Sequence, residues 1–361
     1  MEDKQVKEKV VFSNLRYYFL LMQTYELMEE IAHLIPASGI YRESRKIKVN
    51  RYLSKSGWVL NKFEGKEEDI KPHEECESYV SPAVKEWEKL DEILCKLNDI
   101  TVTVKKVYRK INNCTEEKIL NYVEYNGLKF AYAGKPSDLK AVEDFLKMQS
   151  VSMNERILGL ERTNIILDPE ATAHVFHQFM SFLKGDNSRI KLGERISREI
   201  TVYDDPLSES LIGFSTFDDE GVKTRKKEII GDGTILEYLG TLTTKNGNPG
   251  NARGILPIPD YFNLIIKPKD WGFQELIQDT KNGLLVLGVK KSEIVKNSIR
   301  IFPRNSMLIG YGGAVVREIA IPLQELVTID AISKEVKSVY IDDEHGGISP
   351  FIRLKARPIV Y

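Results

Sequence analysis

The chain has 361 residues, of which 42% are hydrophobic, and this length predicts two domains. Single hydrophobic cores rarely grow beyond about 250–300 residues. The 52 basic and 53 acidic residues leave a formal net charge of -1, so no global field attracts nucleic acid or an anionic membrane. The apolar run Phe19 to Met22 is far shorter than the roughly 20 residues that span a bilayer, and no cleavage site follows it. We therefore expect a cytoplasmic protein without membrane or nucleic-acid partners.

The cysteine pattern predicts no structural role for sulfur. Cys76, Cys95 and Cys114 are widely spaced and include no CxxC pair, which argues against a disulfide framework or a zinc ribbon. His73 and Cys76 lie in the charged stretch 64–77, which is typical of a solvated linker rather than of a metal site. We expect three ordinary thiols.

The N-terminal half has the pattern of a mixed helix and strand domain. Ser13 or Asn14 can cap a helix whose apolar positions recur at helical spacing as far as Met28, and Asn126-Gly127 is a hairpin signal. We predict, in chain order, a helix, strands and turns, a second helix, a strand, a hairpin and a closing helix, over 13–28, 40–63, 81–94, 100–108, 122–133 and 137–150. This half is predicted to form an α+β domain over residues 1–150.

The C-terminal half, residues 155–361, is rich in strand-like runs separated by turn dipeptides. Predicted strands include a hairpin over 229–236, followed by segments at 284–289, 298–303, 315–322 and 351–360. Helices are predicted only at 169–184 and 272–280. The overall fold class is therefore α+β, with a β-rich, antiparallel, barrel-like second domain that carries one prominent helix.

The helix at 169–184 has the clearest boundaries in the chain. Asp168 is a natural N-cap, Pro169 suits the first helical position, and Gly185 is predicted to end the helix in a left-handed conformation. At about 100° per residue, the apolar residues fall on one face and the ligand-type residues on the opposite one. The apolar face contains Phe176, Phe179, Met180 and Leu183, and the polar face contains His174, His177, Gln178 and Ser181.

The polar face leaves two interpretations open. An exposed HxxH pattern is more often a solvated helix face than a metal site. A metal site would require a second segment, and His345 in the turn-like stretch 342–347 is the natural candidate. Gln178 stands where a metallopeptidase has the Glu that takes a proton from water, and a neutral amide cannot act as that base.

A series of short motifs in the second half resembles the TldD/PmbA family. Each motif alone is weak, but their order and spacing are consistent over about 160–361. They are Pro169 to Asp186, Leu192-Gly193, Ile200 to Pro206, Phe217 to Val222, Gly250 to Arg253, Pro257 to Pro259, Asn263, Lys281 to Gly283 and Gly346 to Pro350. The N-terminal half resembles the family only loosely.

The resemblance implies a two-domain, intracellular, dimeric protein that encloses a cavity in which unfolded peptide is cut. In that family the TldD type holds zinc through an HExxxH helix and a later Cys, whereas the PmbA or TldE type lacks these residues. His177 falls at the first zinc His, Gln178 replaces the Glu, Phe182 replaces the second His, and Asp342 falls near the Cys. The resemblance therefore implies a PmbA/TldE-like chain with a degenerate motif and no catalytic residues of its own.

Three functions follow as hypotheses. The favoured one is a noncatalytic subunit that contacts peptide while a TldD-type partner, or a second copy in a homodimer, completes the assembly, with zinc supplied by the partner. The second is a metallopeptidase with a rearranged metal site made of His174, His177, Asp342 and His345, in which Asp343 or Glu344 acts as the base. The third is a peptide-binding scaffold without a proteolytic partner. Asp218-Asp219-Glu220 is weighed separately and predicted to form a tight turn before Gly221 rather than a cation site.

Overall fold

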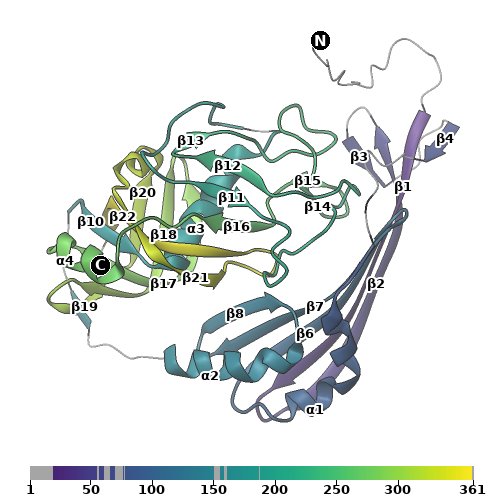
Figure 1. The fold of residues 1–361 in the computed structure, drawn as a ribbon, viewed down its shortest axis with the longest axis horizontal. Helices are drawn as coiled ribbons and strands as arrows, with labels where there is room; N and C mark the ends of the chain where they lie inside the picture. The colour runs from purple at the N-terminus through teal and green to yellow at the C-terminus, as the bar shows by residue number, and fades with distance from the viewer. Residues whose placement is uncertain are drawn as a thin grey trace.

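The computed structural model describes residues 19–54, 57–60, 66–69, 76, 78–149, 155–157, 161–186 and 188–359. Two large sheets dominate it, one built from the N-terminal half and one from the C-terminal half (Figure 1). The predicted α+β class is confirmed, and strands greatly outnumber helices in the described part. The predicted division at 1–150 and 155–361 stays a prediction, although the change from one sheet to the other falls between α2 and β9.

The N-terminal sheet has eight strands. Six of them follow the order β3-β2-β1-β6-β7-β5, while β4 pairs with β1 and β8 pairs with β7. Its strands are β1 (Phe19–Ile35), β2 (Gly39–Ser54), β3 (Gly57–Val59), β4 (Lys66–Asp69), β5 (Tyr79–Val80), β6 (Thr101–Ile111), β7 (Cys114–Tyr125) and β8 (Leu128–Ala133). Its helical segments are the 3-10 turns η1 (Pro82–Lys89) and η2 (Pro136–Asp138), and the helices α1 (Leu90–Leu94) and α2 (Leu139–Gln149). These helical segments pack on one face through a core that includes Trp87, Leu90, Val102 and Leu146. The other face is turned toward the C-terminal half (Figure 1).

The predicted helix at 13–28 is wrong within the described residues, because Phe19–Ile35 forms the long strand β1; residues 13–18 lie outside them. The strand pairs with β2 from Leu21 to Ile35 and with β6 from Tyr25 to Leu34. Hydrogen bonding and packing on both sides outweigh a local pattern that is compatible with a helix. The remaining N-terminal predictions are confirmed where their residues are described, including Pro82 at the first helical position and the Asn126-Gly127 turn, where both residues have positive φ. Residues 55–56, 61–63 and 150 of the predicted segments lie outside the described part.

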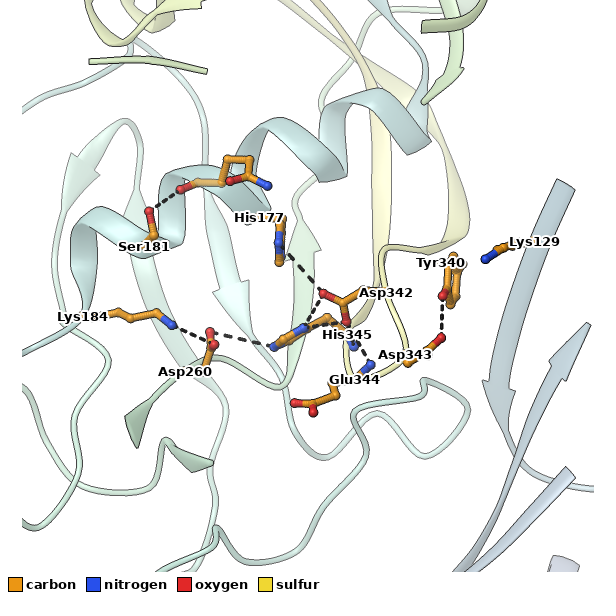
Figure 2. Close-up of a pocket in the computed structure, with 11 residues that line it drawn as sticks. Lys129, His177, Ser181, Lys184, Asp260, Tyr340, Asp342, Asp343, Glu344 and His345 are labelled. Carbon is orange, nitrogen blue, oxygen red and sulfur yellow. Dashed lines mark hydrogen bonds and ion pairs between the residues drawn. The ribbon is translucent and has the colours of Figure 1, made fainter. Parts of the chain in front are cut away.

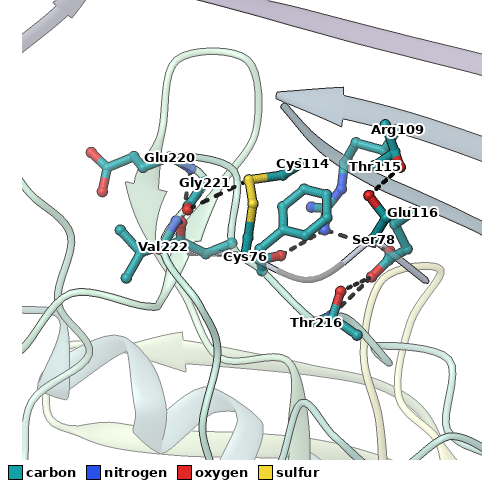
Figure 3. The surroundings of a disulfide bond; sticks show 12 residues. Cys76, Ser78, Arg109, Cys114, Thr115, Glu116, Thr216, Glu220, Gly221 and Val222 are labelled. Atoms are coloured by element: carbon teal, nitrogen blue, oxygen red, sulfur yellow. Dashed lines mark hydrogen bonds and ion pairs between the residues drawn. A yellow bond between two sulfur atoms is a disulfide. The ribbon is translucent and has the colours of Figure 1, made fainter. Parts of the chain in front are cut away.

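The expectation of three free thiols is also wrong. Cys76 and Cys114 form a disulfide with a Cα–Cα distance of 5.7 Å, and Cys95 is the free cysteine among the described residues (Figure 3). Wide sequence spacing hid the pair, because the chain between them forms β5, η1, α1 and β6 before it returns to the start of β7. His73, considered with Cys76 in the linker, lies outside the described residues.

The C-terminal sheet has 12 strands and is mostly antiparallel, with parallel pairs at β10–β17, β16–β22 and β9–β19. The strands of this half are β9 (Glu155–Ile157), β10 (Thr163–Leu167), β11 (Val202–Asp204), β12 (Lys227–Gly231), β13 (Thr234–Ile235), β14 (Ala252–Arg253), β15 (Ile258–Pro259), β16 (Asn263–Ile266), β17 (Leu284–Val295), β18 (Ser298–Leu308), β19 (Gly312–Val315), β20 (Glu318–Pro322), β21 (Ala331–Tyr340) and β22 (Gly346–Ile359). The strands β14 and β15 pair only with each other. The helical segments are α3 (Pro169–Met180), η3 (Ser181–Leu183), α4 (Phe273–Thr280) and η4 (Leu323–Thr328).

Strand β20 gives this sheet its barrel-like shape. It pairs with both β18 and β22, and so closes a ring that runs through β10 and β17. Helix α3 packs against the inner side of this curved sheet, and the core around it includes Phe176, Phe179 and Leu354. The predicted hairpin at 229–236 and the helix near 272–280 are confirmed as β12–β13 and α4.

A buried junction joins the two halves. We call Arg51, Arg109, Glu116, Asp219 and Glu220 the junction cluster; each of these residues is at most 8% exposed. Arg109 Nη1 donates to Asp219 Oδ1 at 2.6 Å and lies beside Glu116, while Trp58 Nε1 donates to Glu220 Oε1 at 2.6 Å. The Cys76–Cys114 disulfide lies beside this cluster (Figure 3). The junction fixes the N-terminal sheet to the loop that carries residues 215–224.

None of the helices in the part of the chain described above is long and apolar enough to cross a bilayer. The predicted cytoplasmic location stays a prediction.

Candidate functional site

Helix α3 begins as the sequence predicts. Asp168 Oδ1 accepts a hydrogen bond from Ala171 N at 2.9 Å, and Pro169 occupies the first turn. The other carboxylate oxygen accepts from Gly288 N at 2.9 Å, so the cap also fixes the helix to β17. Burial raises the pKa of Asp168 to about 7, and the neighbouring Glu170 adds to this effect. The start of the helix is therefore held from two directions.

The end of the helix differs from the prediction. Gly185 is not left-handed; the helix tightens into η3 and stops at Lys184, whose backbone is extended. Gly185 is required for another reason, because a Cβ at this position would collide with the carbonyl oxygen of Asn246. The glycine allows two backbone segments to pass close to each other rather than acting as a cap.

The two predicted faces of α3 are confirmed. Phe176, Phe179, Met180 and Leu183 are all at most 1% exposed, within the core of the curved sheet. His177, Gln178 and Ser181 line a cavity of about 610 Å³ (Figure 2). The helix therefore presents its polar side chains to a space that can accept a ligand.

The pocket is lined by α3, by the segment that joins β21 to β22, and by two further elements. Asp342, Asp343, Glu344 and His345 come from the β21–β22 turn, and Asp260 follows β15. Lys129, from β8, is contributed by the N-terminal sheet. The N-terminal half therefore forms part of the wall of the pocket.

His177, Asp342 and His345 come together in this pocket (Figure 2). His345 Nδ1 lies 2.8 Å from Asp342 Oδ1 and 2.9 Å from Oδ2, and His177 Nε2 lies 3.9 Å from Oδ2. Each residue offers one ligand atom, and these atoms all lie within 4.8 Å of one another. Three of the four residues proposed for a rearranged metal site are thus brought together.

His174, the fourth residue, does not belong to this group. Its Nδ1 lies 3.1 Å from Ser292 Oγ on β17, and its ring centroid is 6.5 Å from that of His177. Burial lowers the pKa of His174 to about 4, with a further contribution from His177. His174 is therefore a neutral side chain hydrogen-bonded to β17 at neutral pH.

Gln178 and Phe182 occupy the positions that matter most for the sequence comparison. Gln178 Nε2 donates to Ser292 Oγ at 2.9 Å and to its carbonyl oxygen at 3.2 Å. Phe182 is 2% exposed, is not among the pocket-lining residues, and packs against Phe179 with ring centroids 6.2 Å apart. A second pocket-facing ligand at residue 182 would require a different helix geometry.

Two neighbouring residues that the sequence analysis did not identify, Asp260 and Tyr261, contact the histidines. Tyr261 Oη lies 2.6 Å from His177 Nδ1, and its ring stacks near that of His345, 4.4 Å away. Asp260 Oδ1 lies 3.8 Å from His345 Nε2, and its other oxygen accepts from Lys184 Nζ at 2.8 Å. The only sequence signal was their position between the two motifs Pro257 to Pro259 and Asn263.

The charge states within the pocket follow from these contacts. Burial raises the pKa of Asp342, but the hydrogen bond from His345 and its charge outweigh this effect and hold the pKa well below its ordinary value. Burial and the nearby His345 lower the pKa of His177, so this imidazole is neutral at neutral pH. A neutral imidazole beside a carboxylate can bind a metal ion, because one ring nitrogen keeps a free lone pair.

The acidic run 218–220 forms the predicted tight turn. Gly221 N donates to the Asp218 carbonyl at 3.0 Å, and Asp218 Oδ1 accepts from Glu220 N and Val222 N, both at 2.9 Å. Its second oxygen accepts from Ala252 N at 3.0 Å. The carboxylate of Asp218 is used in hydrogen bonds to the backbone, and those of Asp219 and Glu220 belong to the junction cluster, so the run is a structural turn rather than a cation site.

Comparisons with known proteins place the C-terminal half in a family. The model of the PmbA/TldA metallopeptidase C-terminal domain matches residues 160–356. A metalloprotease of Methanocaldococcus jannaschii is 35% identical over 146 residues, which is 36% of this chain and 32% of that protein. A metalloprotease of Methanothermobacter thermautotrophicus is 31% identical over 149 residues, or 37% of this chain and 33% of that protein. The matched segment thus spans about a third of these relatives.

The whole chain also resembles a solved structure. The TldE protein of Thermococcus kodakarensis superposes with a TM-score of 0.66, covering 95% of this chain and 96% of that one. The sequence identity is 17%, so this likeness concerns the fold. The likeness of fold extends over the N-terminal sheet, whose sequence resembles the family only loosely.

Proposed function

This chain belongs to the PmbA/TldA metallopeptidase family, and from this premise we propose that it is a TldE-like subunit of a peptidase pair. In this proposal it binds unfolded peptide in the pocket beside α3, and a TldD-type partner carries the zinc that cleaves it. The chemistry that zinc supplies in such a partner is the activation of water and the polarisation of the peptide carbonyl.

One observation carries the proposal. Phe182, at the position of the family's second zinc His, is packed in the core, and Gln178, at the position of the Glu, is hydrogen-bonded to Ser292. Helix α3 therefore offers His177 alone as a ligand to the pocket and carries no carboxylate in the position of the base. The helix retains the position of a catalytic helix without the groups that hydrolysis requires.

The pocket retains features that suit a peptide backbone. Its lining is polar and contains both signs of charge, including the lysines Lys184 and Lys129 and the carboxylates of Asp343 and Glu344. Backbone amides need hydrogen-bond donors and acceptors more than they need a deep apolar cleft. The lining therefore supports recognition of unfolded chains with little preference for their side chains.

A second candidate function is a metallopeptidase with a rearranged site, which the meeting of His177, Asp342 and His345 favours. It would need Asp343 or Glu344 as the base, and both line the pocket. Asp343 Oδ1 accepts from the Tyr340 hydroxyl at 2.7 Å, and Glu344 lies 3.4 Å from Arg253. Both carboxylates are engaged with other groups, so the first function is preferred.

The test is cleavage of an unfolded protein by this chain alone, by a TldD-type chain of the same genome alone, and by the mixture. The proposal predicts cleavage that requires the TldD-type chain and co-elution of the two chains as one complex. Cleavage by this chain alone that is lost in Glu344→Gln or Asp343→Asn would establish the second function instead. If this chain binds peptide but no TldD-type chain associates with it, the third hypothesis, a peptide-binding scaffold, would be supported instead.

A further inference from the structure

We propose that His177, Asp342 and His345 bind one divalent transition-metal ion, such as Zn²⁺, and that Asp260 and Tyr261 hold the two imidazoles in position. This inference goes beyond the proposed function, because a metal ion without a base ties the pocket together rather than cleaving peptide. The proposed ligands come from two elements: His177 from α3, and Asp342 and His345 from the β21–β22 turn.

The ligand atoms face a common point. His177 Nε2 and His345 Nδ1 both approach the Asp342 carboxylate, and the ligand atoms of the three residues lie within 4.8 Å of one another. Bonds of about 2.0–2.2 Å to a shared ion require small rotations, because the hydrogen-bonded His345 Nδ1 and Asp342 Oδ1 must separate slightly and His177 Nε2 must approach the carboxylate. The side chains of His177 and Asp342 are 25% and 43% exposed at the pocket surface, so they have room to rotate.

The second nitrogen of each imidazole faces an oxygen atom. His177 Nδ1 lies 2.6 Å from Tyr261 Oη, and His345 Nε2 lies 3.8 Å from Asp260 Oδ1. Histidines that bind metal usually donate their other N–H to a carboxylate or another acceptor, which fixes the tautomer and the ring orientation. Asp260 and Tyr261 are consecutive residues, so a single segment orients both rings.

An unpartnered nitrogen supports the same assignment. His345 is 6% exposed, and its Nε2 is buried without a hydrogen-bond partner. If the neutral ring donates its Nδ1 proton to Asp342, then the lone pair of Nε2 faces the Asp260 carboxylate, which is unfavourable. Metal binding at Nδ1 moves the proton to Nε2, where Asp260 can accept it.

A doubly protonated His345 would also satisfy both carboxylates, and this is the competing explanation. The two explanations differ in what they require of His177. A protonated His345 repels a second cation and needs no contribution from His177, whereas a metal site loses a ligand when His177 is removed. The choice of metal follows from the donors. Two imidazoles and one carboxylate suit zinc and similar divalent transition-metal ions rather than calcium or magnesium.

The test measures metal binding directly in the full-length chain after chelation and dialysis. Titration with Zn²⁺ against a chromophoric chelator should show about one tight site per chain, and Co²⁺ should give a visible absorption band from the bound ion. His177→Ala and His345→Ala should each abolish the tight site. Asp260→Asn should weaken binding by about 10–100-fold, as expected for a partner of a ligand.

His174→Ala is the matched control, because this histidine lies on the same helix but contacts Ser292. It should bind Zn²⁺ like the unmodified chain. Since His345 is buried, folding of each variant is checked by circular dichroism. If His345→Ala unfolds, the outcome is decided by His177→Ala, because the side chain of His177 is 25% exposed. Equal binding by His177→Ala and the unmodified chain, or no tight site at all, would overturn the proposal. Cleavage assays do not enter this test, so it can fail while the proposed function holds.

Discussion

The junction cluster and the pocket use the same residue types for opposite purposes. In the junction, Arg109 donates to Asp219 and to the carbonyl oxygen of Phe217, and Glu116 accepts from Thr216 N at 2.8 Å. In the pocket, the side chains of His177 and Asp342 are 25% and 43% exposed. Each cluster contains one buried nitrogen without a partner, Arg109 Nε and His345 Nε2, so exposure is what distinguishes the two. Buried charges that are paired with one another hold the fold together, whereas a partly exposed set is available for a ligand.

The largest expected effect is on the junction. Arg109→Met should lower the free energy of unfolding by about 3–5 kcal/mol, because it leaves the buried Asp219 side chain without its cation, while Glu116 keeps Lys118 at 2.9 Å. Urea denaturation followed by circular dichroism measures this. Arg45→Met is the matched control, since the Arg45–Glu43 pair is 62% and 40% exposed and should contribute less than about 1 kcal/mol. Equal effects of the two substitutions would show that the junction cluster is not the structural element described.

The disulfide beside the junction gives the next effect. Reduction should lower the free energy of unfolding by about 2–4 kcal/mol, because the bond limits the freedom of the unfolded chain. A thiol titration should find one reactive cysteine, Cys95, in the native chain. After reduction and unfolding it should find all three. If all three thiols react without reductant, the disulfide is absent, and the prediction of three free thiols from the sequence is correct.

Asp168 provides a pH test of a buried carboxylate that accepts hydrogen bonds from two backbone amides. Its folded-state pKa of about 7 exceeds the ordinary value of 3.8, so the folded chain binds more protons between these limits. Stability should therefore fall as pH rises from about 4 to 7. Asp168→Asn keeps an N-cap and should give a flatter curve. Its lost hydrogen bond to Gly288 shifts the whole curve without changing the slope, so an unchanged slope would contradict the assignment.

The smallest effect on stability should come from the pocket. Lys184→Met removes the ion pair with Asp260, whose side chains are 27% and 21% exposed, and should cost less than about 1 kcal/mol. The same type of substitution in the junction, Arg109→Met, is expected to cost several times more. If Lys184→Met lowers the free energy of unfolding as much as Arg109→Met does, the proposed difference between the junction cluster and the pocket is contradicted.

The sequence predicted the site better than it predicted the N-terminal sheet. The N-cap and the faces of α3 depend on neighbouring residues, and so Asp168, Pro169 and the spacing of His177 and Phe179 were sufficient to predict them. The end of the helix was not predicted correctly, because Gly185 is needed for close contact with a distant segment. The two predicted faces of α3 are confirmed by burial alone. Local signals of this kind are the most reliable part of a sequence.

The failures share a physical cause, which is contact between distant parts of the chain. The strand β1 is fixed by its pairing with β2 and β6, and no local signal records that pairing. Cys76 and Cys114 are 38 residues apart, and Asp260 and Tyr261 meet His345 and His177 only after the sheet has formed. The separation of His174 from the group formed by His177, Asp342 and His345 also depends on β17, which supplies Ser292.

The most direct test of the account is whether unfolded peptide binds in the pocket beside α3. Ser181 is exposed on the polar face of the helix and lines the cavity, so Ser181→Trp should fill part of that space. Met148→Trp places the same side chain on α2, where Met148 is 73% exposed and remote from the pocket lining. We expect fluorescence anisotropy with a labelled unfolded peptide to show at least about tenfold weaker binding for Ser181→Trp and no change for Met148→Trp. Unchanged binding by Ser181→Trp would contradict the claim that this pocket is the functional site.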